Sequence, residues 1–376
     1  MKNTKRVLSL VLIVFMLMQY LPGSVAVIAA GDLQYNYSSQ YNSGKRGEIA
    51  TTLNGTNADS YYSGSYEYDT LSQKSGQALI DALDRLMTDT HSHISTYQEC
   101  HDLAHRTDCE QGNGNGSSKS TKYISLFYTG YTASQNDWVV NNVGWNREHV
   151  WPQSKGKSST SGGGADLHHV RPACASVNSS RGNKAYGNVT GGNKTYSSSK
   201  FGTSLGGYSS SSYFYPKHDG KSNVTGDEID IRGDVARICL YVYVRWGSDW
   251  GATESDFTSG ASGVFQSIDV LLEWCALDPV DTWELGRNEV VEDIQGNRNV
   301  FIDYPEYAWL IFDREVPEDM TTPSGEAAEG VNTNTNTGTN AGTNAGNNTQ
   351  VKLGFFEMIA RWFENLLRTL FPFFYK

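Results

Sequence analysis

The chain has 376 residues, a mass of 41.5 kDa and a formal net charge of −11 at pH 7. Its five cysteines allow at most two intramolecular disulfides, which excludes the disulfide-dense scaffold that small secreted domains need. Taken alone, the negative charge also argues against a polyanionic partner.

The first 30 residues have the pattern of a secretory signal peptide. Three basic residues precede an apolar run over 7–21, and small residues follow it up to Ala30. The run is too short and wrongly flanked to favour a permanent membrane span, although an uncleaved anchor is an alternative. We therefore expect a secreted, extracellular protein.

Regular structure should begin after the Tyr-, Ser- and Asn-rich segment 31–69, which has no sustained period and predicts an extended or loosely ordered chain. A helix is expected after Ser75, because apolar residues between 79 and 87 recur at the spacing of one helical face. Further along, Cys100 and Cys109 could close a local loop.

The segment 144–187 concentrates the side chains that carry chemistry. We expect a strand that ends near Glu148 and His149, because Pro152 cannot continue a central ladder. A mobile Ser/Gly turn, a second strand over 166–171 and a helix over 173–182 should follow. This β-loop-β-α hairpin would direct its side chains towards one point.

The rest of the folded chain is expected to be mostly helical. After a predicted strand over 123–128 and the hairpin, the Gly-, Ser- and Tyr-rich segment 188–229 suits a long surface region. Apolar runs predict helices over 234–246 and 264–277, and the charged stretch 283–294, which ends at Gln295 and Gly296, predicts a third. The aromatic segment 297–312 should pack on them. Together these elements predict an α+β fold.

The C-terminal segments have a different composition. Residues 321–350 form a low-complexity Asn/Thr/Gly linker that has almost nothing to bury, so we expect it to be disordered. Residues 351–376 form an amphipathic helix with charged and apolar faces, and the charges argue against a membrane span. This helix could lie on a membrane or cell-envelope surface, pair with a like helix or fold back onto the domain.

Charge is unevenly distributed along the chain. Residues 116–250 carry fifteen Lys and Arg against nine Asp and Glu, whereas residues 251–330 carry three Arg against eighteen Asp and Glu. The hairpin therefore lies in the locally basic part, which fits contacts to phosphate. The simpler alternative is that segregated charge only keeps the protein soluble.

Glu148, His149 and Asn178 have the side chains that phosphodiester hydrolysis needs. A histidine can take a proton from water near neutral pH, which makes His149 the candidate general base. A hard cation such as Mg²⁺, Mn²⁺ or Ca²⁺ prefers oxygen ligands and keeps several waters, so Glu148 and Asn178 suffice to bind one ion. Neighbouring residues on a strand point to opposite faces, so Glu148 and His149 can serve one site only if the strand ends or bends there.

Other residues of the motif could bind phosphate or orient the site. We group Arg181 with the catalytic residues. The basic residues that could contact phosphate, which the sequence does not rank, are Arg147, Arg171, Arg181, Lys155 and Lys157. The residues expected to orient the metal ligands and the base are Asp166, His168 and Asn183.

Three other interpretations of the motif compete with this one. A zinc site could use His149, His168 and His169 and hydrolyse some other ester, although no cysteine pair supports a structural zinc. Cys174 could be a nucleophile, but nothing in the sequence marks it as activated. Finally, the chain could be a noncatalytic protein that keeps the fold and binds nucleic acid or a surface. No protein partner is indicated.

At these residues the sequence resembles a known family. The motifs WNREHVWPQS, DLHHVRP and NSSRGN are similar to those of the secreted bacterial endonuclease I family, a branch of the His-Me finger (ββα-metal) nucleases, and especially to its Gram-positive extracellular nuclease and ribonuclease branch. The resemblance covers roughly 61–312 and continues through RGDVARICLYVYVRWG, LLEWCALDPVD and RNEVVEDIQGNRNVFIDYPE.

The resemblance implies a nuclease domain over 70–320 with a His-Me finger hairpin inside a mostly helical domain. It implies that His149 is the general base and that Glu148 and Asn178 bind a single divalent ion. It also implies sequence-nonspecific cleavage of DNA, RNA or both, with 5′-phosphate products. In some relatives a catalytic arginine comes from a longer insert between the two strands, where this chain has only Lys155 and Lys157.

Overall fold

The computed structural model describes residues 46–51, 53, 58–109, 123–157, 160–197, 203–220, 228–318 and 320–323. The predicted signal peptide, nearly all of the linker and the C-terminal amphipathic helix lie outside these residues. Within the described part of the chain, no helix is long and apolar enough to cross a membrane.

The N-terminal part of the domain is helical from residue 58 onwards. Residues 58–69, which we expected to be extended, contain α3 (Ala58–Tyr61), the 3-10 helix η1 (Gly64–Tyr66) and the first residues of α4 (Tyr68–Leu71). Tyr62 explains this, because its ring packs edge-on against Tyr304 and its hydroxyl donates to Asp303. The helix expected after Ser75 is α5 (Gly76–Asp89), whose apolar face is buried.

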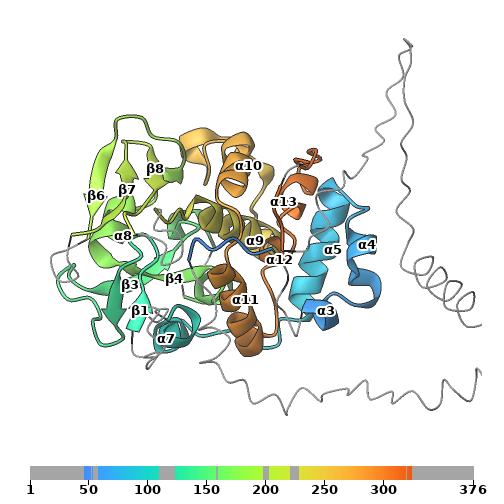
Figure 1. Ribbon diagram of the computed structural model, residues 1–376, viewed down its shortest axis with the longest axis horizontal. Helices are drawn as coiled ribbons and strands as arrows, with labels where there is room; N and C mark the ends of the chain where they lie inside the picture. Colours follow the sequence, from blue (N-terminus) through green and yellow to red (C-terminus); the bar gives the residue numbers. More distant parts are fainter. Residues whose placement is uncertain are drawn as a thin grey trace, which may run out of the picture. The chain divides into compact units, whose positions relative to one another are not determined.

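The predicted hairpin is present as two antiparallel strands and a helix. Strand β3 (Trp145–His149) pairs with β4 (Val170–Cys174), and α8 (Ala175–Arg181) follows at once (Figure 1). The second strand begins later than the predicted 166–171. The reason is a turn at 166–169, in which the Asp166 carboxylate accepts a hydrogen bond from the backbone N–H of His168 (2.8 Å).

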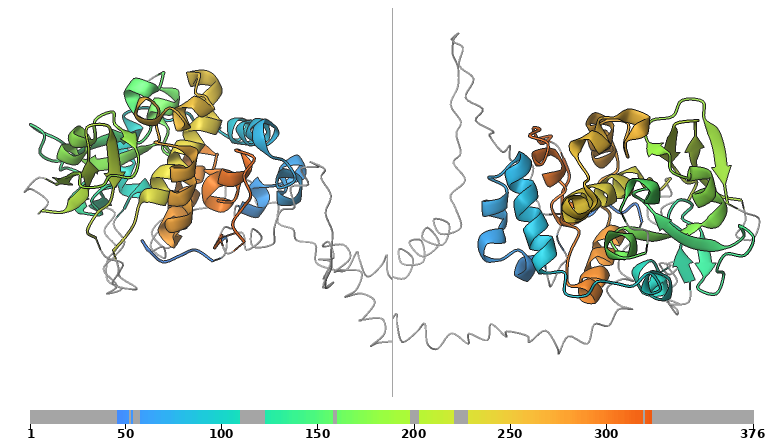
Figure 2. Two further views of the ribbon diagram at one scale, coloured as in Figure 1. Left: turned by 90° about the horizontal axis from the view of Figure 1, so that it is seen from above. Right: turned by 180° about the vertical axis from the view of Figure 1, so that it is seen from behind.

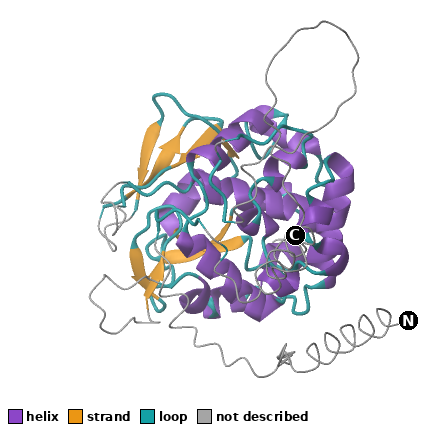
Figure 3. Ribbon diagram, turned by 45° about the vertical axis from the view of Figure 1, so that its right-hand side comes forward, coloured by secondary structure: helices purple, strands orange, loops and turns teal. Residues whose placement is uncertain are grey.

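A second sheet occupies much of the segment that we predicted to be a long surface region. Its strands are β5 (Ala185–Tyr186), β6 (Asn193–Tyr196), β7 (Leu205–Ser209) and β8 (Tyr213–Pro216), in the order β5-β8-β7-β6. The prediction was wrong here because Gly and Ser in these strands hide the alternation of side chains. Strand β1 (Tyr123–Ser125) pairs with β2 (Thr132–Ser134) in a further two-stranded sheet. β1 is shorter than the strand predicted over 123–128. Figure 3 shows the strands gathered on one side of the helices.

The predicted helices over 234–246, 264–277 and 283–294 are confirmed, with shifted ends, as α9 (Arg232–Trp250), α10 (Ile268–Leu277) and α11 (Thr282–Gln295). In the described domain, α5 and the second sheet lie at opposite ends, with α9 and α11 between them (Figures 1 and 2). The remaining helices are α6 (Glu99–Asp102), α7 (Ala104–Thr107), α12 (Val300–Asp303), α13 (Tyr307–Leu310), η2 (Gln153–Lys155), η3 (Gly162–Ala165), η4 (Glu254–Phe257) and η5 (Gly260–Ser262).

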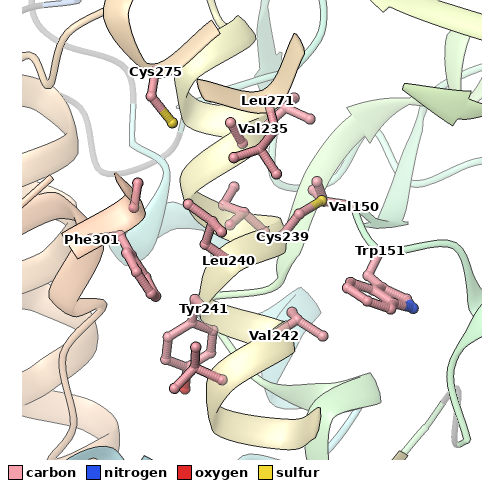
Figure 4. Close-up of a cluster of buried hydrophobic side chains, with 14 of the residues drawn as sticks. Val150, Trp151, Val235, Cys239, Leu240, Tyr241, Val242, Leu271, Cys275 and Phe301 are labelled. Carbon is pink, nitrogen blue, oxygen red and sulfur yellow. The ribbon is translucent and has the colours of Figure 1, made fainter. Parts of the chain in front are cut away.

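Helix α9 is the centre of the hydrophobic core. Most of its residues are buried, as its nearly continuous apolar sequence predicts. Figure 4 shows Trp151, which follows β3, on one side of this helix and Phe301 of α12 on the other. The core therefore anchors the chain just beyond the end of β3, where the two candidate catalytic residues lie.

All five cysteines are buried thiols. The disulfide that the spacing of Cys100 and Cys109 would allow is not formed, and the Cys100 thiol donates to the carbonyl oxygen of Ala165 (3.1 Å). Burial raises the pKa of Cys100 and of Cys275 to about 12. These two thiols are therefore structural rather than reactive groups.

Candidate active site

A cleft of about 460 Å³ opens at the junction of β3 and α8. It brings together six of the residues singled out in the sequence: Arg147, Glu148, His149, Asn178, Arg181 and Asn183. Both Glu148 and His149 line it, although neighbouring strand residues normally face opposite ways. The sequence required the strand to end or bend here if both residues were to serve one site, and β3 does end at His149.

The imidazole of His149 is fixed in one orientation. Its Nε2 donates to the carbonyl oxygen of Gly164 (2.9 Å), and its ring stacks on Tyr97 with the centroids 5.6 Å apart. A carbonyl oxygen only accepts, so the ring hydrogen is on Nε2 and the basic lone pair is on Nδ1. This histidine is therefore prepared to accept a proton at Nδ1.

Glu148 is 1% exposed, and its carboxylate is held by the backbone of His149 and by the side chains of Tyr128 and Arg181. Oε1 accepts a hydrogen bond from the Tyr128 hydroxyl (2.5 Å) and lies 3.3 Å from a guanidinium nitrogen of Arg181. Burial raises the pKa of Glu148, while Arg181 and the Tyr128 hydrogen bond oppose this shift. The site thus holds a buried carboxylate whose charge depends on these partners and on the backbone hydrogen bond from His149.

Asn178 presents an amide with a defined orientation. Its Nδ2 donates to Asn146 Oδ1 (2.9 Å) and to the carbonyl oxygen of Arg147 (3.2 Å). Because both partners are acceptors, the nitrogen end faces them and Oδ1 is directed away from them. The cleft therefore contains one carboxylate and one oriented amide oxygen, a donor set that suits a hard cation retaining several waters.

The two arginines of the cleft are held differently. Arg181 is buried, and besides Glu148 its guanidinium binds the carbonyl oxygens of His149 (3.1 Å) and Val150 (2.5 Å). Arg147 lies over the Tyr97 ring, 3.6 Å from its centroid, and forms no ion pair with any described carboxylate. Arg181 therefore braces the end of β3, whereas the charge of Arg147 is left for a ligand.

Three of the predicted phosphate contacts do not line the cleft. Arg171 is buried and forms an ion pair with Asp108 (2.8 Å). The ammonium of Lys155 donates to the carbonyl oxygen of Gly263, and Lys157 is exposed outside the cleft. Their place in the motif therefore does not bring these side chains to Glu148 and His149.

Asp166 and His168 connect the hairpin to the helices rather than to the catalytic side chains. The Asp166 carboxylate accepts hydrogen bonds from Tyr241 (2.6 Å) and Trp246 (2.8 Å) of α9, and His168 Nε2 donates to the carbonyl oxygen of Asn297 (2.9 Å). Burial opposes ionisation of Asp166, but His91, His168 and the donors together hold its pKa below the usual range. Asn183, by contrast, is exposed and lines the cleft.

The geometry does not support the zinc or the cysteine interpretation. His169 Nδ1 donates to the carbonyl oxygen of Gly163 (2.6 Å) and Nε2 accepts from the backbone N–H of Trp151 (3.0 Å), so neither ring nitrogen is left for a metal. Within the described residues, no group of three or more His, Cys, Asp and Glu is placed to hold a metal ion. The Cys174 thiol is buried and bonds to the Ser176 hydroxyl (3.3 Å), outside the cleft.

Sequence reasoning missed Tyr97, Tyr128 and Gly164. Tyr97 and Tyr128 precede the motif by many residues and reach it only through the fold. Gly164 acts through its backbone oxygen, which no side-chain pattern reveals. The aromatic run that contains Tyr128 gave a strand signal but no indication of a catalytic contact.

Comparisons with known proteins show the family of this chain. The family model described as Endonuclease I matches residues 75–306, which include both strands of the hairpin and the core helices. The chain is 36% identical over 256 residues to an extracellular ribonuclease of Bacillus subtilis (strain 168), covering 66% of this chain and 77% of that protein. It is also 36% identical over 249 residues to an extracellular ribonuclease of Bacillus amyloliquefaciens, covering 64% of this chain and 76% of that protein. This protein is therefore a nuclease that belongs to the endonuclease I family.

Proposed function

We propose that this protein is a secreted, nonspecific endonuclease that hydrolyses phosphodiester bonds of DNA, RNA or both, with one divalent cation and His149 as general base. The observation that carries the proposal is the convergence of an oriented imidazole, a carboxylate and an amide oxygen in one cleft. We infer that β3, β4 and α8 are a His-Me finger. Secretion is supported by the names of the relatives.

His149 activates the attacking water in this mechanism. Its Nδ1 takes the proton, and the imidazolium that forms keeps its Nε2–H on the carbonyl oxygen of Gly164. The Tyr97 ring limits rotation of the imidazole. The base therefore needs no reorientation when it receives the proton, which lowers the barrier.

Glu148 and Asn178 would hold the cation, for which Mg²⁺, Mn²⁺ and Ca²⁺ are the candidates. When bound, the ion supplies neutralisation of phosphate charge and support for the leaving oxygen. Arg181 and Tyr128 favour the ionised form of Glu148 and hold it in place, and Arg147 contacts the phosphate. Hydrolysis with the water attacking phosphorus and the 3′-oxygen leaving gives 5′-phosphate products.

The test is cleavage of duplex DNA, single-stranded DNA and structured RNA by the secreted protein in EDTA, followed by addition of Mg²⁺, Mn²⁺, Ca²⁺ or Zn²⁺. We expect cleavage to stop in EDTA and to return with Mg²⁺ or Mn²⁺ but not with Zn²⁺. His149→Ala should abolish cleavage without loss of folding, and His93→Ala, which changes an exposed histidine outside the cleft, should leave it unchanged.

Three outcomes would overturn the proposal in whole or in part. An active His149→Ala variant would remove His149 as the base, and activity that EDTA does not affect would remove the cation. If no substrate is cut but nucleic acid is bound, the alternative of a noncatalytic binding protein stands.

We also propose that residues 351–376 attach the protein to a cell surface. The test is a vesicle-binding assay that compares the full chain with a chain ending at residue 350.

A further inference from the structure

A second cavity, of about 710 Å³, lies over the four-stranded sheet. Its floor is a row of side chains across three strands, because Lys194 of β6 is opposite Tyr208 of β7, which is opposite Tyr215 of β8. Arg232 extends this row, since its guanidinium carbon lies 5.4 Å from the centroid of the Tyr215 ring. The floor is thus two tyrosines between two basic residues.

The opposite face of this sheet is closed, so the row is presented outwards. Gly207, the neighbour of Tyr208 on β7, faces the Phe214 ring so closely that a Cβ there would lie 2.6 Å from it. Phe214, between Tyr213 and Tyr215 on β8, is fully buried. Tyr208 and Tyr215 are half-exposed, and Lys194 is exposed. The alternation along the strands therefore places these three side chains on the open face.

The wall of the cavity is fixed to the helices. The Asn188 amide donates to the Glu273 carboxylate (3.1 Å) and accepts from the indole of Trp274 (3.0 Å). Both partners belong to α10. The cavity is therefore a formed feature of the fold, and its entrance loop 188–192 is held at Asn188.

The charges around the cavity are mixed. Arg232 forms an ion pair with Asp230 (2.5 Å), and Lys217 forms one with Glu228. Lys194 forms no ion pair within the described part of the chain. A site of this kind would not attract polyanions over long range, but it offers two aromatic faces with cations at both ends. Aromatic rings stack on exposed bases of any sequence, and cations beside them contact phosphate.

We propose that this cavity binds a single-stranded segment of the nucleic-acid substrate, with bases on Tyr208 and Tyr215 and phosphates at Lys194 and Arg232. The inference rests on the proposed nuclease function and adds a substrate-binding site outside the catalytic cleft. Bases in a duplex are stacked on one another and present only their edges. The site therefore favours single strands, or the unpaired parts of a folded strand.

The two sites are close enough to share one strand. Asn183 lines the catalytic cleft and Asn188 lines the second cavity. Five residues span at most about 17 Å of extended backbone. The linings of the two sites therefore come within about 17 Å of each other, a distance that a single strand several nucleotides long can span.

The first test is equilibrium binding of a labelled thymidine oligonucleotide, and of a duplex of equal length, to the whole chain carrying His149→Ala in EDTA. In this background Tyr208→Ala and Tyr215→Ala should each weaken single-strand binding about tenfold, in the range measured for loss of one stacked base. Lys194→Gln should lower the slope of log affinity against log salt by about 0.7. Tyr123→Ala, which removes an exposed tyrosine of β1 that lines neither cavity, should change nothing.

The second test uses the active enzyme. Tyr208→Ala and Tyr215→Ala should raise KM for long single strands about tenfold and leave cleavage of a dinucleotide unchanged. Tyr215 contacts Trp274, so Tyr215→Ala could lower stability, and the melting temperature of each variant is measured as a control. If Tyr215→Ala does not fold, Lys194→Gln, which changes an exposed side chain, replaces it in this test.

The outcomes separate this inference from the proposed function. If wild type cuts nothing, the nuclease proposal fails, while the binding measurement still decides on the cavity. If wild type cuts but the Tyr208 and Tyr215 variants behave like Tyr123→Ala, the cavity is not a substrate site. Equal weakening for duplex and single strand would overturn stacking as the mode of binding.

Discussion

Tyr128 and Arg181 act on the carboxylate of Glu148 from two elements that are far apart in the sequence. Burial favours the neutral acid, and these partners favour the ion. The proposed cation needs the ionised form, so the acidic limit of activity depends on this balance. A residue that never touches the substrate therefore influences the pH range of the enzyme.

Tyr128→Phe tests this balance. Loss of the hydrogen bond should raise the pKa of Glu148 further, so the acidic limb of the kcat/KM profile should move to higher pH. Tyr62→Phe is the matched control, because it removes a hydroxyl that donates to Asp303 (2.8 Å) outside the cleft. An acidic limb at the same pH in both variants would show that Tyr128 is only structural.

Tyr97 gives a second prediction at this scale. Its ring stacks on His149 and carries Arg147 on top, so Tyr97→Ala should lower kcat about tenfold or more by loosening the base. Tyr97→Phe keeps the ring and should retain most of the activity. If both substitutions cost the same, the hydroxyl rather than the stacked ring is what matters.

At the residue scale, the sequence predicted the site residues that belong to one local motif. Glu148, His149, Asn178 and Arg181 do meet in one cleft. Arg171 is in the same motif but is paired with Asp108, a contact between segments that are adjacent only after folding. A motif shows which side chains are near in the chain, and long-range packing decides which of them face the cleft.

At the scale of elements, the short helix η3 (Gly162–Ala165) links His149, the proposed general base, to the core. The carbonyl oxygens of Gly163 and Gly164 hold His169 and His149. The Gly163 α-carbon is packed so tightly that a Cβ there would lie 2.4 Å from Trp250. This turn needs glycine because the indole rings of α9 occupy the space of a side chain.

Gly163→Ala should therefore displace the turn. We expect a loss of about 1–3 kcal/mol in the free energy of unfolding, typical of overpacking, together with lower kcat, because the acceptor of His149 moves. Gly247→Ala in α9 is the opposite case. Nothing lies closer than 4.0 Å to a Cβ there, so the change should stabilise the protein by about 0.5–1 kcal/mol. Urea titration measures the change in free energy of unfolding for both variants. Changes of the same sign in the two variants would contradict the packing argument.

The predictability of elements follows their periodicity. α9 has a long apolar run and α11 is a charged stretch with a clear end at Gln295 and Gly296, and both were predicted closely. β7 has the sequence LGGYS, in which two glycines remove the side chains that would reveal a strand. Gly206 is glycine because α8 approaches it, and this contact is not visible in the sequence.

For the molecule as a whole, an ion cluster around Arg298 meets the start of the domain, because Asp303 of this cluster also binds Tyr62. Arg298 pairs with Asp303 (2.7 Å), Glu289 (2.8 Å) and Glu292, and Asp303 also accepts from Tyr62 near the start of the domain. Arg298→Met would leave these carboxylates without their cation and should cost about 3–5 kcal/mol in urea unfolding. Arg314→Ala, which breaks an exposed pair with Asp269, should cost less than about 1 kcal/mol.

A buried histidine makes stability depend on pH. Burial lowers the pKa of His218 to about 3, and Nδ1 accepts from the backbone N–H of Gly220 (3.1 Å). Below pH about 6.5 the unfolded chain binds a proton at this residue that the folded chain does not, so the folded state loses about 1.4 kcal/mol per pH unit.

The comparison with His218→Gln isolates this effect, since other groups titrate equally in both proteins. The difference in free energy of unfolding, wild type minus variant, should fall as the pH is lowered from 6.5 towards 4. Parallel curves in urea titrations across this range would contradict it.

The five buried thiols have a practical consequence if the protein is secreted, as proposed. With no disulfide to form, folding requires neither an oxidant nor an isomerase, and reducing conditions outside the cell do not weaken the fold. Each thiol becomes accessible to an alkylating reagent only when the surrounding structure opens. The rate of labelling at Cys100 would then measure how often the hairpin loop opens. The rates at Cys239 and Cys275 would measure the opening of the core between α9 and α10.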